Sequence, residues 1–209
     1  ENIDYIDSNI DEDNFDGALV DAEDEDFVKT ENVDVFSKHF FENFTSSDIE
    51  TIKQNNQVVS TKHNWPGLGS FTNFHQSDDK FNLVKVDKPY QKIEQLQLRP
   101  ILTENMSKTM MTRTRNQSNS LTPLQHELLG LMSSYKSVLF TEQTLDNGEQ
   151  IRVSYCAHAL NHVLKTRSRI VSHNARINQN KTEKEEYRDQ GLTRPKVLIV
   201  VPFRESAYQ

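Results

Sequence analysis

The chain has 209 residues, of which 34 % are hydrophobic and 26 % are charged, so it can form one domain of ordinary size with a modest core. Its single cysteine excludes an internal disulfide framework and a multi-cysteine zinc module. The longest uninterrupted apolar run, residues 197–201, is far shorter than the about 20 residues that a membrane-spanning helix needs. We therefore expect part of a longer soluble protein of a reducing compartment, with no membrane partner.

The net charge of −7 conceals a strong asymmetry along the chain. Residues 1–50 contain 17 acidic and two basic residues, which leaves 14 acidic and 22 basic residues in the rest of the chain. We predict that residues 1–32 form an acidic disordered tail, because like charges at this density oppose compaction. The alternative is an acidic strip that docks on a basic partner through its scattered aromatic residues.

The next segment, residues 33–120, has isolated apolar residues separated by polar residues and turn signals. Four phenylalanines with helical spacing (i, i+4, i+5 and i+8) share one face of a predicted helix: Phe36, Phe40, Phe41 and Phe44. Ser46 or Ser47 can cap a second short helix. The only tryptophan, Trp65, precedes a Pro-Gly turn signal.

We interpret residues 33–120 as an extended, largely irregular arm with short helices, which docks on partner proteins through these phenylalanines and Trp65. The alternative is that the aromatic residues pack against the protein's own remainder. Residues 93–101 form a short amphipathic piece that we expect to end near Pro100. Residues 103–120 are rich in Ser, Thr, Asn and Met and are typical of a linker.

The most organised part of the sequence is residues 121–209. Thr122 followed by Pro123 predicts a helix start, with Thr as the N-cap and Pro at the first helical position. A second helix is expected over 151–171, with an apolar face that includes Cys156 as a small buried side chain.

Two strands complete this predicted domain. Residues 137–140 are a short buried-strand candidate, and residues 196–202 are too apolar for an edge strand. A strand without alternation is buried on both faces, as in a parallel sheet covered by helices. The order helix, strand, helix, strand therefore predicts an α/β domain.

The end of the chain resembles one motif of DEAD-box RNA helicases. The segment VLIVVPFRESAYQ (197–209) is similar to a strand followed by Pro-Thr-Arg-Glu-Leu-Ala-x-Gln, although Phe203 and Ser206 depart from that pattern. This resemblance implies the first part of a RecA-like parallel-sheet domain, with Arg204 near the RNA sugar-phosphate backbone. Thr122 to Gln125 likewise resembles the Thr-Pro-Ile-Gln segment, whose Gln reads adenine in that family.

The phosphate-binding loop of such helicases is missing from the sequence. That loop needs Gly-x-x-x-x-Gly-Lys-Ser/Thr, in which backbone amides cradle phosphates and the hydroxyl holds magnesium. None of the six glycines precedes a Lys-Ser or Lys-Thr pair. The most similar pair, Lys165-Thr166, falls within the predicted helix. We therefore expect no catalytic residue, no cofactor and no nucleotide site, and we give Gln125 only a capping role.

Three longer strings make the resemblance more specific. They are similar to the digestive organ expansion factor family, which comprises nucleolar pseudo-helicases counted among the U3 small nucleolar RNA-associated proteins: LTPLQHELLGLMSSYK, YCAHALNHVLKTRSR and RDQGLTRPKVLIVVPFR. The resemblance implies a nucleolar role in small-subunit ribosomal RNA maturation, with processome proteins, components of the U3 ribonucleoprotein and pre-rRNA as partners.

The candidate RNA contacts are four basic residues: Arg204, Arg167, Arg169 and Lys165. An exposed basic helix face is an equally good explanation of the last three. His158 and His162 have metal-ligand spacing, but the Glu of His-Glu-x-x-His is absent, so we predict no metal site.

The sequence thus favours a non-catalytic assembly factor with a tail (1–32), a docking arm (33–120) and the first part of a pseudo-helicase domain (121–209). One alternative is an ATP-dependent RNA helicase with a divergent nucleotide site. Another is an acidic, chaperone-like protein that shields basic ribosomal proteins through residues 1–32.

Overall fold

The computed structural model describes residues 34–41, 44–54, 57–82, 84–113, 121–178 and 195–208. The expected acidic tail lies outside these residues. The chain divides into two units, one formed by Asn32–His162 and one that contains Val163–Gln209. None of the described helices combines the length and the apolar character needed to cross a bilayer.

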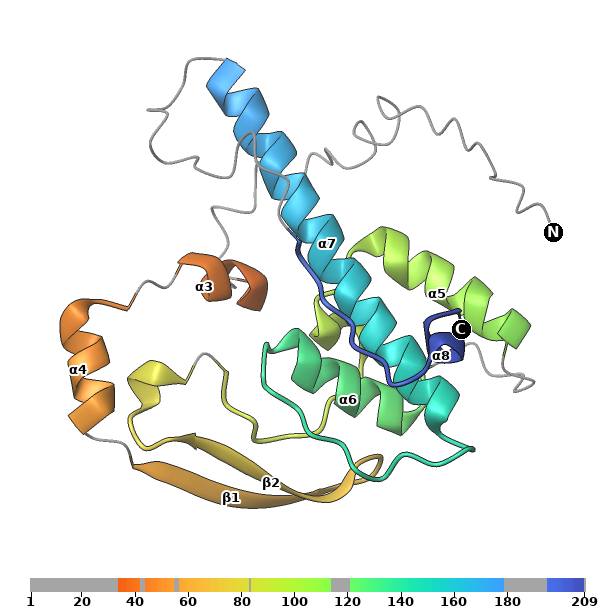
Figure 1. Ribbon diagram of the computed structural model, residues 1–209, viewed down its shortest axis with the longest axis horizontal. Helices are drawn as coiled ribbons and strands as arrows, with labels where there is room; N and C mark the ends of the chain where they lie inside the picture. The colour runs from red at the N-terminus through yellow and green to blue at the C-terminus, as the bar shows by residue number, and fades with distance from the viewer. Residues whose placement is uncertain are drawn as a thin grey trace. The chain divides into compact units, whose positions relative to one another are not determined.

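The first unit contains most of the described elements (Figure 1). In chain order these are α3 (Val35–Phe41), α4 (Ser46–Gln54), β1 (Val58–Trp65), β2 (Gly69–Gln76), the 3₁₀ helices η1 (Asp79–Phe81) and η2 (Ile93–Leu96), α5 (Pro100–Arg113), α6 (Pro123–Ser133) and the first half of α7 (Gly148–Asn178). The second unit contains the rest of α7 and the short helix α8 (Arg204–Tyr208).

Strands β1 and β2 form an antiparallel hairpin that the sequence analysis did not predict. The register runs from Val58 opposite Gln76 to Trp65 opposite Gly69, and the predicted turn after Trp65 connects the strands. Gly69 has φ 68°, a left-handed conformation that glycine adopts without a steric penalty. Because exposed and half-buried residues alternate along both strands, the hairpin has an inner and an outer face.

Helix α6 is the centre of the first unit. Its Leu129 belongs to a buried apolar cluster with Leu96, Leu121 and Ala157. Its Leu131 belongs to a second cluster with Trp65 and Val86, so the hairpin and the connection after it pack on this helix (Figure 1). Much of the predicted arm is therefore part of this unit's own core.

The chain also approaches α6 closely at Gly130. A Cβ atom at this position would lie 2.3 Å from the Tyr90 ring, so only glycine leaves room for the ring. The Tyr90 hydroxyl is hydrogen bonded to Ser134 Oγ at 2.7 Å, which fixes the ring over the helix. This contact joins residues 44 positions apart in the chain.

The linker predicted over 103–120 is wrong for its first part, because α5 covers residues 100 to 113. Pro100 begins this helix instead of ending the preceding piece, as suits a first helical position whose N–H needs no partner. The polar side chains are satisfied locally: Thr103 Oγ1 donates to the Pro100 carbonyl and Asn105 Nδ2 to that of Ile101. Residues 114–120 lie outside the described set.

Helix α7 was predicted correctly, but its buried face was not. Cys156 is exposed, and so is Leu160 in the next turn. The buried face combines apolar residues, Ile151 and Ala157, with the polar residues Ser154 and Asn161. Ser154 Oγ donates to the Gln150 carbonyl, and the Asn161 side chain bonds the segment before α5. Hydropathy could not predict this face, because these buried groups are paired by hydrogen bonds.

The two predicted strands of the α/β domain do not form in the described residues. Residues 137–140 and 195–201 are irregular there, and Leu139 and Leu198 are 90 % and 86 % exposed. A strand requires hydrogen bonds to a neighbouring strand, and neither segment has one among the described residues. The described sheet is the two-stranded antiparallel hairpin, so helices with a small sheet are observed and a parallel sheet is not.

Candidate functional site

The start of α6 has the predicted cap, and the polar atoms of Gln125 are already used in hydrogen bonds there. Thr122 is the N-cap and Pro123 the first helical residue, as expected. Gln125 is 1 % exposed, and its Oε1 accepts from the Thr122 N–H at 3.0 Å. Its Nε2 donates to the Gln150 carbonyl at 3.5 Å. The Gln125 Oε1 completes the capping box and its Nε2 connects the cap to α7, which supports a structural role and not adenine recognition.

A buried carboxylate fixes the hairpin turn to α6, and sequence reasoning missed it. Glu127 is 2 % exposed, and its Oε2 accepts hydrogen bonds from the backbone N–H groups of Gly67 (3.0 Å) and Leu68 (2.7 Å). A Cβ atom on Gly67 would lie 2.4 Å from the Leu124 nitrogen, so the two backbones touch. The only sequence signal was an acidic residue on an otherwise apolar helix face.

The end of α6 has an unusual backbone conformation. Tyr135 has φ 55°, a left-handed value that is uncommon for a bulky residue. The Tyr135 N–H donates to the Met132 carbonyl and the Lys136 N–H to the Leu131 carbonyl, which together form a Schellman motif. This motif usually carries glycine at the left-handed position, so a large side chain there must be held by its surroundings.

The surroundings of Tyr135 are a cluster of rings from α3 and α7. The His39 ring stacks on Tyr135 with a centroid distance of 4.2 Å and an interplanar angle of 13°. His158 and His162 approach the Tyr135 ring edge-on, with centroid distances of 5.5 and 5.8 Å. The Tyr135 hydroxyl and His162 Nδ1 are hydrogen bonded at 2.8 Å. The two histidines therefore hold a tyrosine, and no group of three or more metal-ligating side chains occurs among the described residues.

Burial governs the protonation of this cluster. It raises the pKa of Tyr135 well above its usual range, and the Asp34 carboxylate adds to the effect. Burial likewise lowers the pKa of His158 below its ordinary value, and His162 lowers it further. Near neutral pH the Tyr135 hydroxyl is therefore protonated and His158 is neutral, which suits packing and hydrogen bonding rather than charge.

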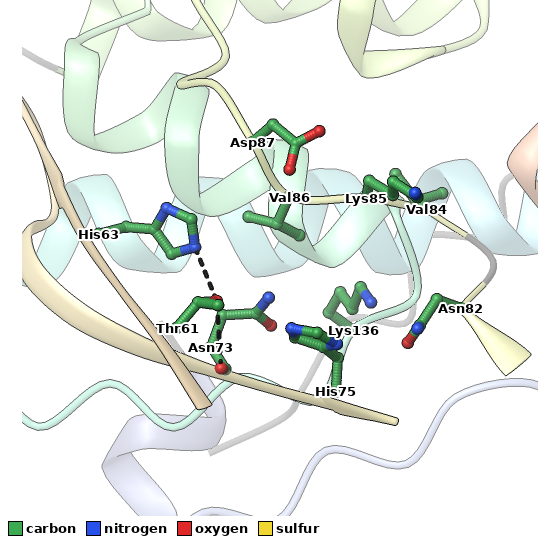
Figure 2. Close-up of a pocket in the computed structure, with 10 residues that line it drawn as sticks. All are labelled: Thr61, His63, Asn73, His75, Asn82, Val84, Lys85, Val86, Asp87 and Lys136. Atoms are coloured by element: carbon green, nitrogen blue, oxygen red, sulfur yellow. Dashed lines mark hydrogen bonds between the residues drawn. The ribbon is translucent and has the colours of Figure 1, made fainter. Parts of the chain in front are cut away.

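A pocket of about 220 Å³ is lined by the inner face of the hairpin, by residues 82 and 84–87 of the connection that follows it, and by Lys136 (Figure 2). We call it the hairpin pocket. Eight of its lining residues are polar or charged and two are valines: Thr61, His63, Asn73, His75, Asn82, Val84, Lys85, Val86, Asp87 and Lys136. Burial lowers the pKa of Lys136, and no hydrogen bond or ion pair from its ammonium to another described residue is present.

The four predicted RNA contacts lie in the second unit. Lys165 and Arg169 are one turn apart on α7 and half-buried, whereas Arg167 is exposed on another side of the helix. Arg204 begins α8, where its Nη2 donates to the Tyr208 hydroxyl at 3.1 Å. Its guanidinium carbon lies 5.6 Å from the centre of the Tyr208 ring. The structure thus places three of the four on one helix and leaves their role as RNA contacts a prediction.

The aromatic docking candidates fall into three groups. Phe36 and Trp65 are buried within the chain, Trp65 at 4 % exposure, which is the packing alternative. Phe44 is 55 % exposed and lies 6.0 Å from the Phe81 ring, centre to centre. The side chains of Phe40 and Phe41 lie outside the described set. Phe44 is therefore the described candidate that a partner can reach.

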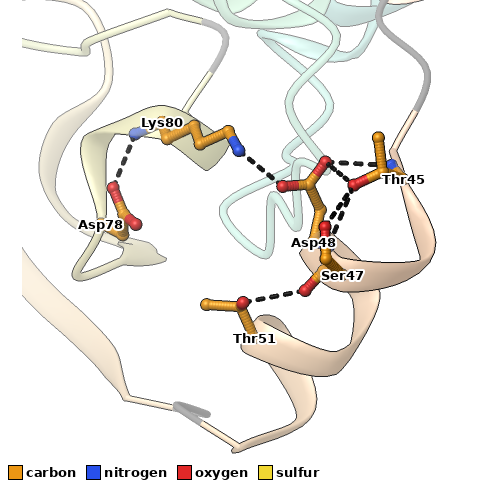
Figure 3. Close-up of polar contacts among 6 residues, drawn as sticks. All are labelled: Thr45, Ser47, Asp48, Thr51, Asp78 and Lys80. Atoms are coloured by element: carbon orange, nitrogen blue, oxygen red, sulfur yellow. Dashed lines mark hydrogen bonds and ion pairs between the residues drawn. The ribbon is translucent and has the colours of Figure 1, made fainter.

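Polar contacts hold the helix after Phe44 in place (Figure 3). The N-terminal cap of α4 is Thr45 and not Ser46 or Ser47, since the Asp48 N–H donates to Thr45 Oγ1 and the Thr45 N–H donates to Asp48 Oδ2. Lys80 Nζ forms an ion pair of 2.5 Å with Asp48 Oδ1, which joins α4 to η1. The hydrogen bond from Lys80 lowers the pKa of Asp48 far below its ordinary value.

Two kinds of known sequence match this chain: a family model matches its last part, and whole proteins match most of its length. The model of the "UTP25, NTP hydrolase-like domain" matches residues 135–209. Proteins named "U3 small nucleolar RNA-associated protein 25 homolog" from Mus musculus and Homo sapiens are each 37 % identical over 83 % of the chain. "U3 small nucleolar RNA-associated protein 25" from Candida glabrata is 37 % identical over 64 % of it.

These matches confirm the family resemblance predicted from the sequence. The chain spans only 23 % of the mouse relative, 24 % of the human one and 20 % of the Candida glabrata one. No solved structure matches the chain.

Proposed function

Because this chain is homologous over most of its length to the U3 small nucleolar RNA-associated protein 25 proteins, we propose that it acts in the U3-containing small-subunit processome. In this proposal it is part of a non-catalytic assembly factor of the nucleolus, needed for pre-rRNA processing and maturation of the 18S rRNA. It works as a scaffold that binds processome proteins and pre-rRNA, without a nucleotide cofactor.

The proposal that the protein is non-catalytic rests on the conformation of the two segments that resemble nucleotide-binding motifs. Gln125 is buried in the cap of α6 with both polar ends engaged. Lys165 and Thr166 lie inside the continuous helix α7. Inside a helix each backbone N–H already donates to a carbonyl four residues earlier, so it cannot cradle a phosphate.

The finer parts of the proposal concern the fold and the contacts. Residues 197–201 are proposed to become a buried strand of a RecA-like parallel sheet in the whole protein. Two observations support this: their apolar side chains are largely exposed in the described chain and need a covering partner, and the NTP hydrolase-like domain matches residues 135–209. Residues 1–32 are proposed as an acidic tail, 33–120 as the arm that presents Phe44, and 121–209 as the start of a pseudo-helicase domain. Arg204 and the basic residues of α7 are the proposed RNA contacts.

A variant at Lys165 tests the scaffold against the helicase alternative. Cells depleted of the endogenous protein would be complemented with the full-length protein or with its Lys165→Met variant, and 18S rRNA levels would be measured. The scaffold proposal expects no saturable nucleotide binding by either protein, since the lysine has no phosphate loop to complete. It expects substantial but not necessarily complete rescue by the variant, because Lys165 is only one of several proposed RNA contacts. Binding of a fluorescent ATP analogue with magnesium would be measured alongside.

Two results would overturn the non-catalytic proposal: failed rescue together with loss of nucleotide binding in the variant, or micromolar nucleotide binding by the wild type that RNA strengthens. The better-supported function would then be an ATP-dependent helicase with a divergent nucleotide site. Recovery of U3 RNA with the tagged wild type tests the association itself, and its absence would reject the processome role.

A further inference from the structure

The hairpin pocket has a basic side chain whose charge the described chain does not balance. The ammonium of Lys136 makes no hydrogen bond or ion pair with another described residue, although the side chain is half-buried. The one carboxylate in the lining, Asp87, forms no ion pair with it, and Figure 2 shows the two side chains apart in the pocket. A partly buried cation is costly unless an anion compensates its charge, so the pocket is suited to an anionic ligand.

The rest of the lining supplies further donors beside this lysine. Asn73, from β2, has a half-buried side chain that makes no hydrogen bond within the described residues. The His75 Nδ1 donates to the Gln76 carbonyl oxygen at 2.9 Å, so the ring is a neighbour of these donors and, in its neutral form, has an acceptor at Nε2. Lys136, Asn73 and His75 all line this pocket and are labelled in Figure 2.

The backbone of Lys136 is fixed before any ligand binds. Its N–H closes the Schellman motif on the Leu131 carbonyl, and the residue before it is Tyr135 in the left-handed conformation. Tyr135 is in turn held by His39 and His162. Strained backbone of this kind persists only where surrounding contacts enforce it, and it is concentrated at functional sites. A fixed backbone reduces the entropy that Lys136 loses on binding to that of its side chain.

We propose that the hairpin pocket binds a phosphate group of an RNA backbone, with Lys136 as the charged donor and Asn73 and His75 beside it. The choice of RNA rests on the proposed processome role, whereas the preference for an anion rests on the pocket alone. This site lies in the first unit, separate in sequence from the four predicted RNA contacts on α7 and α8.

Size and composition favour an RNA phosphodiester over other anions. The volume of about 220 Å³ equals roughly seven water molecules at ~30 Å³ each, so there is room for part of a sugar beside the phosphate. Phosphopeptide sites typically contain clusters of arginine, and no arginine lines this pocket. Residues 51–209 also contain 22 basic and 14 acidic residues, which favours a polyanion.

The test is RNA binding by the full-length protein that contains this chain. A fluorescein-labelled single-stranded RNA of about 12 nucleotides would be titrated at several potassium chloride concentrations, with anisotropy as the signal. For Lys136→Met we expect about a tenfold weaker affinity at low salt, as for loss of one charge-assisted hydrogen bond. We also expect the slope of log K against log salt to become shallower by about 0.7, the value for one phosphate contact on a single strand.

Lys62→Met is the matched control, because Lys62 is exposed between two pocket-lining positions of β1 and therefore points to the outer face. We expect it to change the affinity less than twofold. Asn73→Asp is a second variant of nearly equal size that places a carboxylate in the pocket, and we expect it to weaken binding as Lys136→Met does. Urea unfolding of each variant verifies that the fold is retained.

Equal affinities and slopes for Lys136→Met and Lys62→Met would overturn the proposal, and so would a wild type that does not bind the RNA. Titration with a labelled phosphoserine peptide separates the two polyanion classes: a Lys136-dependent loss for the peptide alone would reject RNA as the ligand. Recovery of U3 RNA with the tagged protein is read separately. If U3 RNA is recovered while Lys136→Met binds RNA normally, the pocket assignment fails and the processome role stands.

Discussion

Removal of the Glu127 carboxylate is predicted to loosen the hairpin from α6. Its Oε2 accepts the N–H groups of Gly67 and Leu68 at 3.0 and 2.7 Å, and the side chain is almost fully buried. In Glu127→Ala both N–H groups lose a charged acceptor. Each buried donor left unpaired costs about 1–3 kcal/mol.

The structure narrows this range. Gly67 and Leu68 are half-buried, so water can replace part of what the carboxylate supplied. We therefore expect Glu127→Ala to lower the free energy of unfolding by about 2–4 kcal/mol, a large share of the ~5–15 kcal/mol typical of a domain. Glu127→Gln keeps a neutral acceptor and is expected to cost about half as much.

The assay is urea unfolding of the 209-residue chain, followed by tryptophan fluorescence. Trp65 is the only tryptophan and is buried beside the hairpin turn, so its emission reports on the contact being tested. Glu142→Ala is the control, because Glu142 is exposed; we expect a change within about 0.5 kcal/mol. A Glu127→Ala protein as stable as this control would show that the two hydrogen bonds contribute nothing net.

The elements with strong local signals were predictable from the sequence. Thr122-Pro123 marked the start of α6 because capping depends on residues within one turn, and the structure has that cap. The helical spacing from Phe36 onward likewise indicated α3. In both cases the information lies within a few positions of the element itself.

The elements that depend on distant contacts were not predictable. The hairpin shows no clean alternation in its sequence, because its inner face is lined with polar residues such as Asn73 and His75. Glu127 bonds to a turn 60 residues earlier, and nothing near it in sequence reveals that. Lys136 enters the pocket because the residue before it adopts a left-handed conformation, which sequence patterns assign to glycine.

Two further predictions concern stability. Gly130→Ala should destabilise the chain by about 1–3 kcal/mol despite the better helix propensity of alanine, because the new Cβ would overlap the Tyr90 ring; greater stability in urea unfolding would mean that the ring moves aside. The second is a pH dependence. The pKa of His158 is lowered in the folded state, so the unfolded chain binds its proton first as the pH falls. Stability is thus complete above the unfolded pKa of about 6.5 and declines below it. His158→Gln should make the decline between about pH 7 and 5 shallower, and a parallel decline in the variant would assign it to other groups.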